Sequence, residues 1–272
     1  MQDDDKPSAD TPAIKAGDMW KALRPLTAAR IGLPRSGASL GTPALLDFRL
    51  AHARARDAVG SPLDDGMLQT ELAKLGHEAV VCESAATDRK QYLMRPDLGR
   101  QLKPASIEQL ASAATGGDLT IVVADGLSAQ AAERHAMPVL QALLPLLSTQ
   151  NWSVAPIVLL HNGRVAAGDA AAAALKTHCV LVLIGERPGL SSPDSLGAYM
   201  TWAPSPATSD ADRNCISNIR PEGLPAPAAA AKIAWLLGRM RALKGSGVQL
   251  KDGTDALQVE QAPGVGAEPA AG

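Results

Sequence analysis

The second half of the chain alternates between short apolar runs and helix-like stretches, and this alternation constrains the fold more than any other feature. Three apolar runs, at residues 119–124, 155–160 and 180–184, have the length and composition of buried strands. The segments between them, at 128–147 and 170–176, are rich in Ala and Leu and have helical character. Strands that alternate with helices are typical of α/β proteins. We therefore predict an α/β fold, with a Rossmann-like parallel sheet and flanking helices.

Polar residues follow each apolar run at the point where the predicted strand ends. Asp125 follows the first run, Asn162 the second and Glu186 the third. Parallel strands bring their carboxyl ends to one edge of the sheet, and ligands bind at that edge. For any one loop, ordinary turn geometry is the stronger explanation of such residues. Three aligned loops together favour a composite ligand site.

Composition divides the chain into four expected segments. Residues 1–18 are polar and are expected to form a disordered arm. Residues 19–116 are expected to form a smaller, mostly helical N-terminal region that docks a partner. The Rossmann-like domain is expected to span 117–252, and the Ala/Gly/Pro-rich residues 253–272 are expected to be a disordered tail.

Within the N-terminal region, a Gly-rich basic loop at 31–43 precedes an arginine-studded helical stretch at 44–59. Arginine is favoured at protein interfaces because its planar guanidinium pairs in a bidentate way and loses water readily. A solvated helix face has a similar composition. The loop has few apolar anchors of its own, so a partner surface is the simplest means to order it.

Charge and cysteine content exclude several classes of function. The formal net charge of the 272 residues is -2, with no basic stripe interleaved with aromatics, so we expect no nucleic-acid partner. No uncharged apolar run is long enough to cross a membrane, and the N-terminus does not resemble an export signal. Cys82, Cys179 and Cys215 lack metal-type spacing, and their odd number favours a reducing cytoplasm.

The chain lacks a self-contained catalytic set. No G-x-G-x-x-G follows the first strand and no P-loop motif occurs, so a standard nucleotide site is disfavoured. The segment around Ser128 is not a nucleophile elbow, and Ser128 is predicted to cap a helix. His161 ends a strand, where a hydrogen bond to nearby backbone is the favoured role. Cys215 by itself is typical of a small buried apolar residue. We therefore assign no catalytic residue and no metal ligand to this chain.

Several long motifs carry a resemblance to a known family. They are GERPGLSSPDSLGAY, RNCISNIRP, IVVADGLSA, RPDLGR and the front segment TAARIGLPRSGASLGTPALLDFRLAHARARDAV. Together they closely resemble the small (light) subunit of ethanolamine ammonia-lyase. The resemblance covers residues 23–252, and the motifs are long and uninterrupted, so it is specific.

The resemblance implies an adenosylcobalamin enzyme, a carbon–nitrogen lyase that converts ethanolamine to acetaldehyde and ammonia. It implies activity only in a complex, in which a larger TIM-type-barrel subunit holds the substrate and most catalytic groups. The small subunit helps to enclose the cobalamin at the interface, and the enzyme is a hetero-oligomer of large–small pairs. The implied location is the cytoplasm, and in some relatives the N-terminal arm directs the enzyme to a bacterial microcompartment.

The family's cobalamin contacts are a valine in the GRV loop, the glutamate of GERPGL and the cysteine of R-x-C-[IV]-S-N. In this chain they correspond to Val165, Glu186 and Cys215. A carboxylate can accept hydrogen bonds from corrin amides, a valine offers an apolar contact and a thiol a small polarizable one. An ion pair with Arg187 or Arg213 is an alternative role for Glu186. The chain has no D-x-H-x-x-G motif, as in family members that keep the benzimidazole of the cofactor on cobalt.

Two other interpretations stay open from the residues alone. One is a stand-alone Rossmann-like enzyme that acts on a phosphorylated small molecule. The other is a non-catalytic scaffold that only assembles a partner. The missing catalytic set favours the cobalamin-lyase subunit and the scaffold over the stand-alone enzyme.

Overall fold

The computed structural model describes residues 16–113 and 116–251. The chain divides into two compact units, Met1–Ala53 and Arg54–Gly272. The expected disordered tail, at 253–272, lies outside the described residues, as do residues 1–15 of the expected arm.

The first unit is built from short elements and the beginning of a long helix. They are α1 (Ala16–Leu23), the 3-10 turn η1 (Arg24–Leu26), the hairpin strands β1 (Arg35–Ser36) and β2 (Ser39–Leu40), and the first residues of α2 (Thr42–Gly60). Gly32 has a left-handed φ of 55°, and a side chain there would collide with the ring of Trp20. Arg24 donates hydrogen bonds to the carbonyls of Ile31 and Gly32, so the loop closes back toward α1.

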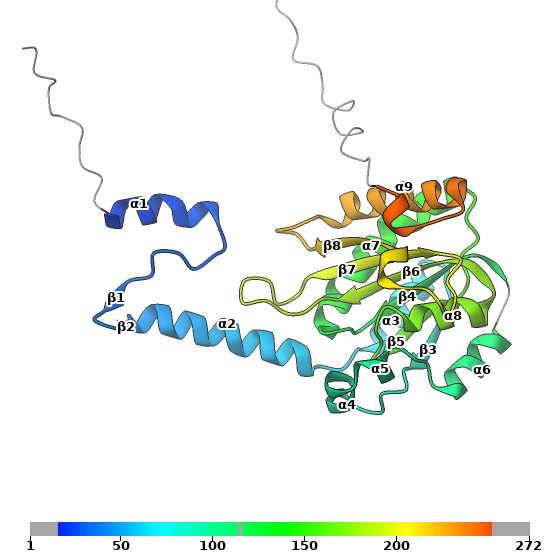
Figure 1. Cartoon of the computed structure of the whole chain (residues 1–272), viewed down its shortest axis with the longest axis horizontal. Helices are drawn as coiled ribbons and strands as arrows, with labels where there is room; N and C mark the ends of the chain where they lie inside the picture. The colour runs from blue at the N-terminus through cyan, green and yellow to red at the C-terminus, as the bar shows by residue number, and fades with distance from the viewer. Residues whose placement is uncertain (1–15, 114–115, 252–272) are drawn as a thin grey trace, which may run out of the picture. The chain divides into compact units, whose positions relative to one another are not determined.

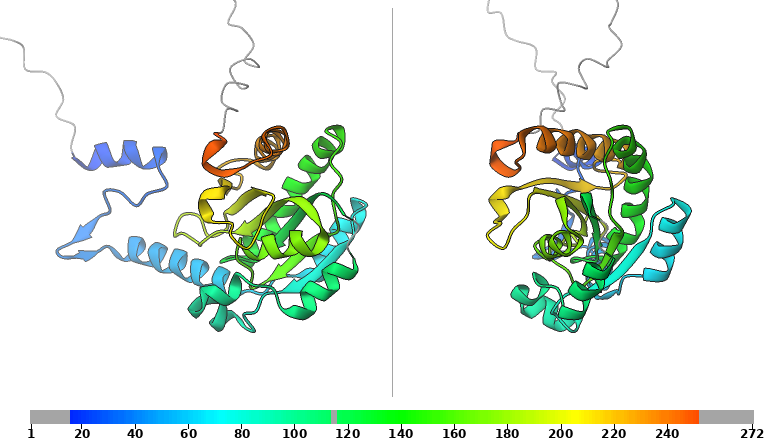
Figure 2. Two further views of the ribbon diagram at one scale, coloured as in Figure 1. Left: turned by 45° about the vertical axis from the view of Figure 1, so that its right-hand side comes forward. Right: turned by 90° about the vertical axis from the view of Figure 1, so that its right-hand side faces the viewer.

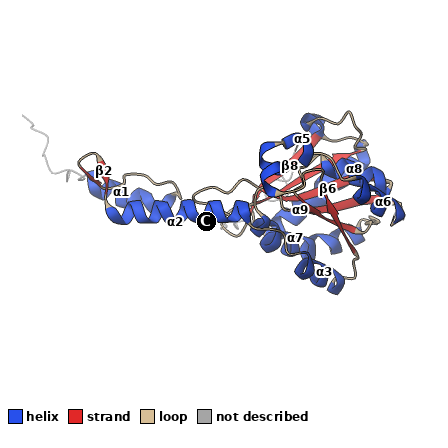
Figure 3. Cartoon of the chain, turned by 90° about the horizontal axis from the view of Figure 1, so that it is seen from below, coloured by secondary structure: helices blue, strands red, loops and turns tan. Residues whose placement is uncertain are grey.

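The second unit contains one six-stranded sheet in the order β3-β5-β4-β6-β7-β8. Figure 3 shows its strands in red, with helices on both sides. The strands are β3 (Ala79–Glu83), β5 (Ile157–His161), β4 (Gly117–Ala124), β6 (Thr177–Gly185), β7 (Leu196–Trp202) and β8 (Arg213–Ile219). The first four in this order run parallel, whereas β7 and β8 pair antiparallel with their neighbours.

The sheet is therefore mixed: the predicted parallel arrangement is confirmed for β4, β5 and β6, and it was wrong for β7 and β8. The last apolar run identified in the sequence ends at residue 184, and no strand was predicted after it because Gly, Pro and Ser interrupt residues 186–226. Gly, Pro and Ser cluster at 187–195 and 203–209, and the strands β7 and β8 lie after these two clusters. Leu196, Met200 and Ile219 are fully buried in the core, and this burial draws both segments into the sheet.

Helices cover both faces of the sheet. One face packs against α3 (Asp65–Lys74), α7 (Ala129–Thr149) and α9 (Ala226–Leu243), and α7 and α9 lie side by side (Figure 1). The other face packs against α6 (Pro104–Ser112) and α8 (Ala167–Leu175). Successive residues of a strand point to opposite faces, so Ile121 and Val123 join the first core and Val122 joins the second. Figure 2 shows the two helical layers from other directions.

Short elements complete the second unit. They are α4 (Arg89–Met94), α5 (Pro96–Gly99), and the 3-10 turns η2 (Asp210–Asp212) and η3 (Gly247–Gln249). The predicted cap is confirmed, because Ser128 Oγ accepts a hydrogen bond from Ala131 N at 3.3 Å at the start of α7. This helix continues through Pro138 and Pro145.

Strand β3 belongs to the sheet, although the sequence reading placed it in the N-terminal region. It pairs in parallel with β5, from Ala79 opposite Ile157 to Glu83 opposite His161. The division between units falls after Ala53, earlier than the expected boundary at 116–117.

Candidate functional site

Loops at the carboxyl ends of the parallel strands line a pocket of about 380 Å³. Gly126 comes from the loop after β4, Val165 from the loop after β5, and Glu186 directly follows β6. Tyr199 of β7 and Tyr92 of α4 complete the walls. The loops that the sequence analysis placed on one rim thus share one concave surface.

A second pocket, of about 230 Å³, adjoins the first. The two pockets share Arg164, Val165 and Tyr199, and the second adds Cys215 from β8. Cys215 lies directly opposite Tyr199 in the antiparallel register of β7 and β8. The structure therefore brings all three expected cofactor residues to one pair of pockets: Glu186 in the first, Cys215 in the second and Val165 in both.

Asp125, directly after β4, holds the loop that follows β5. Its side chain is buried, and its carboxylate accepts hydrogen bonds from the backbone N–H groups of Asn162, at 2.9 Å, and Gly163, at 3.3 Å. Burial raises the pKa of Asp125, and these hydrogen bonds and the Arg89 guanidinium, 3.7 Å away, oppose the rise. Asp125 therefore fixes the loop that carries Val165.

Glu186 is half-buried and is held on one oxygen. Its Oε2 accepts hydrogen bonds from Ser195 Oγ, at 2.7 Å, and from the backbone N–H of Asn218, at 3.2 Å. In the described part of the chain, no ion pair joins Glu186 to Arg187 or Arg213. The alternative role as an ion-pair partner is therefore not supported.

Arg164 lies on the wall that the two pockets share. Its guanidinium stacks over the Tyr92 ring, with Cζ 4.6 Å from the ring centroid, and donates a hydrogen bond of 3.2 Å to the Tyr92 carbonyl. Its Nε is buried and has no hydrogen-bond partner among the described residues. The sequence analysis missed Arg164 and Tyr199, although both lie inside its quoted motifs, GRV and GERPGLSSPDSLGAY.

Cys215 is exposed and belongs to a strand, so the expectation of a buried apolar residue was wrong. Neighbouring atoms still shield its sulfur enough to raise the pKa of Cys215, and a hydrogen bond with the Tyr199 hydroxyl opposes the rise. The thiol therefore presents a neutral, polarizable contact to the second pocket.

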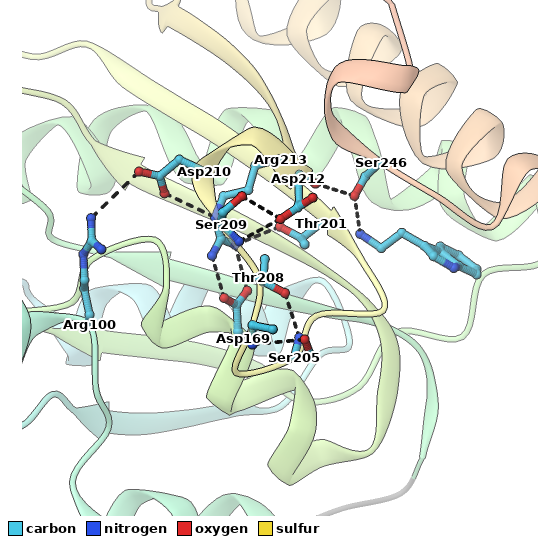
Figure 4. Close-up of polar contacts among 12 residues, drawn as sticks. Arg100, Asp169, Thr201, Ser205, Thr208, Ser209, Asp210, Asp212, Arg213 and Ser246 are labelled. Atoms are coloured by element: carbon cyan, nitrogen blue, oxygen red, sulfur yellow. Dashed lines mark hydrogen bonds and ion pairs between the residues drawn. The ribbon is translucent and has the colours of Figure 1, made fainter.

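A buried ion pair, drawn in Figure 4, holds Arg213, which lines the second pocket. Arg213 donates to both carboxylate oxygens of Asp169, at 2.8 and 2.6 Å, and to Thr201 Oγ1 at 2.9 Å. The exposed Asp210 lies 3.7 Å from Arg213 Nε and 3.8 Å from Arg100 Nη2. These contacts join the first turn of α8 to β7 and β8.

His161 pairs with a side chain and not with backbone. Its Nε2 lies 2.7 Å from Asp65 Oδ2 in the first turn of α3, and it lines neither pocket. Within residues 16–113 and 116–251, no cluster of three or more His, Cys, Asp or Glu residues could hold a metal ion. In the same ranges, no helix is long and apolar enough to span a membrane.

Comparison with known proteins decides the family. The family model of the ethanolamine ammonia-lyase light chain matches residues 17–251. This chain belongs to that family. The ethanolamine ammonia-lyase small subunit of Ralstonia nicotianae is 51% identical, over 92% of this chain and 94% of the relative. The small subunits of Azotobacter vinelandii, 50% identical over 89% and 92%, and of Pseudomonas aeruginosa strain UCBPP-PA14, 47% identical over 94% and 95%, are further relatives. The resemblance inferred from the motifs is confirmed.

Proposed function

We propose that this light chain works with a large subunit as an adenosylcobalamin-dependent ethanolamine ammonia-lyase, which converts ethanolamine to acetaldehyde and ammonia. Membership of the family and about 50% identity over nearly the whole chain support the activity. The relatives are named small subunits, which supports a large-subunit partner and a hetero-oligomer of large–small pairs.

We assign the cofactor to the two adjoining pockets, with Val165, Glu186 and Cys215 as its contacts. The observation that carries this assignment is the convergence of three residues, from a β5 loop, the end of β6 and β8, on the walls around Tyr199. The residues fit an amide-rich corrin edge. Glu186 Oε1 has no hydrogen-bond partner among the described residues and can accept one from an amide N–H, while Arg164 Nε can donate to a carbonyl.

The chain's own part in the chemistry is to position and shield. Adenosylcobalamin supplies the radical chemistry when it is bound. Glu186 and Arg164 orient the polar edge of the ligand, and Val165 excludes water from the shared wall. No side chain here is assigned a proton-transfer step, so the groups that act on ethanolamine are proposed to belong to the large subunit.

The proposed location is the cytoplasm, either free or enclosed in a bacterial microcompartment. All three cysteines are free thiols in the structure, which suits a reducing compartment.

Co-purification with a candidate large subunit, followed by a visible spectrum after addition of adenosylcobalamin, tests the proposal. We expect a stable complex that retains cobalamin through desalting, whereas neither subunit alone retains it equally. If the complex forms but the small subunit makes no difference to cobalamin retention, the chain is an assembly scaffold. If no complex forms, the proposed partner is wrong.

A further inference from the structure

Strand β8 contains a bulge next to the proposed cofactor site. Ala198 pairs with Ile216, but Leu196 pairs with Ile219, so two residues of β8, Ser217 and Asn218, oppose Gly197 of β7. A bulge leaves an extra residue outside the regular ladder and redirects its groups. Here it frees the backbone N–H of Asn218 from the strand pairing.

The bulge is held in one conformation. Asn218 has a left-handed φ of 58°, which asparagine and glycine tolerate better than other residues. Its carbonyl accepts a hydrogen bond from Leu224 N at 2.9 Å, and its Oδ1 accepts one from Arg220 Nε at 2.8 Å. A side chain at Gly223 would collide with the Asn218 carbonyl, so the following turn closes tightly on the bulge.

The backbone N–H of Asn218 and the hydroxyl of Ser195 both donate a hydrogen bond to the same oxygen of the Glu186 carboxylate. Asn218 N lies 3.2 Å and Ser195 Oγ 2.7 Å from Glu186 Oε2. Gly197 of β7 lies beside the same side chain, because a Cβ at this position would be 3.0 Å from Glu186 Oε1 and 3.3 Å from Glu186 Cγ. The missing side chain at position 197 thus leaves room for the glutamate to lie over β7.

We propose that the bulge, Ser195 and Gly197 orient the Glu186 carboxylate, so that Oε2 is held by the protein and Oε1 is presented to a cofactor amide. Ser195 and Asn218 are positioning residues, because they act through Glu186. Hydrogen bonds to an ionised acceptor are the strong ones, so two on one oxygen fix the rotation of the carboxylate. The inference rests on the proposed function, since it concerns the same cofactor contact.

The test is a spectroscopic titration of the large–small complex with adenosylcobalamin. We expect Ser195→Ala to raise the Kd roughly tenfold, the size of one lost charge-assisted hydrogen bond. Gly197→Ala should raise the Kd similarly, because its methyl group displaces Oε1. Ser191→Ala is the matched control, because Ser191 is exposed in the same loop and does not donate to Glu186 among the described residues, so this variant should change the Kd less than about threefold.

A double-mutant cycle separates positioning from a structural role. In a Glu186→Ala background, Ser195→Ala should have no further effect on the Kd, because the carboxylate that accepts the Ser195 hydrogen bond is gone. Additive effects of the two substitutions, or an unchanged Kd for Ser195→Ala alone, would overturn the inference. If Glu186→Ala itself leaves the Kd unchanged, the cofactor assignment of Glu186 is overturned as well, so the two failures are distinguishable. The melting temperature of each complex controls for misfolding.

A measurement without cofactor completes the test. Hydrogen exchange of a peptide that spans 214–219, in the large–small complex, reports on the Asn218 amide. We expect faster exchange in Glu186→Ala than in the unmodified complex, because the acceptor is lost. Equal exchange in both would contradict the hydrogen bond on which the inference depends.

Discussion

At the residue scale, the two pockets combine an acceptor, a donor, an apolar contact and a thiol around one tyrosine. Glu186, Arg164, Val165 and Cys215 supply these groups, and Tyr199 lies on the wall between the pockets. Such a mixture suits a large ligand with methyl groups and amides at its edge better than a small phosphorylated one. Most of these groups were expected from motifs, but their convergence depends on the pairing of β7 with β8.

Replacement of Glu186 by glutamine tests the polar contact. Glu186→Gln should raise the Kd for adenosylcobalamin in the assembled complex by roughly one to two decades, because a charge-assisted hydrogen bond contributes about 1.5–3 kcal/mol. The carboxylate is only half-buried and contributes little to the core, so the melting temperature should hardly change. An unchanged Kd with a lowered melting temperature would assign Glu186 a structural role.

The thiol of Cys215 makes a pH-dependent prediction. Its pKa is raised, mainly by burial of the sulfur, so at any given pH less thiolate is present than in a free cysteine. Alkylation of Cys215 by iodoacetamide in the full chain should therefore have its pH midpoint above that of the same peptide in the denatured chain. Tyr199→Phe removes a hydrogen bond that lowers this pKa, and should move the midpoint higher still.

The buried thiols provide the internal control for that labelling experiment. Burial raises the pKa of Cys82 to about 11 and of Cys179 to about 12. Both should stay unlabelled at neutral pH while the chain is folded. A Cys215 midpoint at or below the denatured value would contradict the shielding of its sulfur.

At the element scale, the sequence predicted what depends on local pattern and missed what depends on pairing. The apolar runs identified β4, β5 and β6, and Ser128 identified the start of α7, because strand length and capping chemistry are local signals. Strand β7 follows a loop rich in Gly, Pro and Ser, and β8 contains several polar residues, so their place in the sheet depends on their neighbours. The absence of any predicted strand over 186–226 left a stretch longer than most loops of compact proteins, and this length is itself a signal for further strands.

The ion pair between α8 and β8 makes an element-scale prediction. The Arg213 side chain is 3% exposed and that of Asp169 12% exposed, so removal of one partner leaves a buried charge. Asp169→Asn should lower the free energy of unfolding by about 3 kcal/mol, measured by denaturant titration. Asp210→Asn is the control, because the Asp210 side chain is 82% exposed, and should cost less than about 1 kcal/mol. Equal losses in the two variants would show that burial of the pair is not what matters.

At the scale of the whole molecule, the first unit has exposed apolar and basic side chains. Leu46, Phe48 and Leu50 of α2 are exposed, as are Arg35 and Arg49. Apolar side chains and arginine are common in protein interfaces. We therefore keep the prediction that residues 31–59 face the large subunit.

Hydrogen exchange of the small subunit, with and without its partner, tests this interface. Residues 31–59 should exchange more slowly in the complex, because partner contacts exclude water and order the loop. Peptides from the buried strand β6 provide the reference, since their protection should be the same in both states. If residues 31–59 show equal protection with and without the large subunit, the interface lies elsewhere.

The central claim is that this chain acts only together with a large subunit and adenosylcobalamin. The most direct measurement is ammonia release from ethanolamine by the chain alone, by the large subunit alone and by their mixture, each with adenosylcobalamin. We predict steady release from the mixture and none from the chain alone, because no catalytic set is complete within its described residues. Steady release by the chain alone, or a rate for the large subunit alone equal to that of the mixture, would contradict the account.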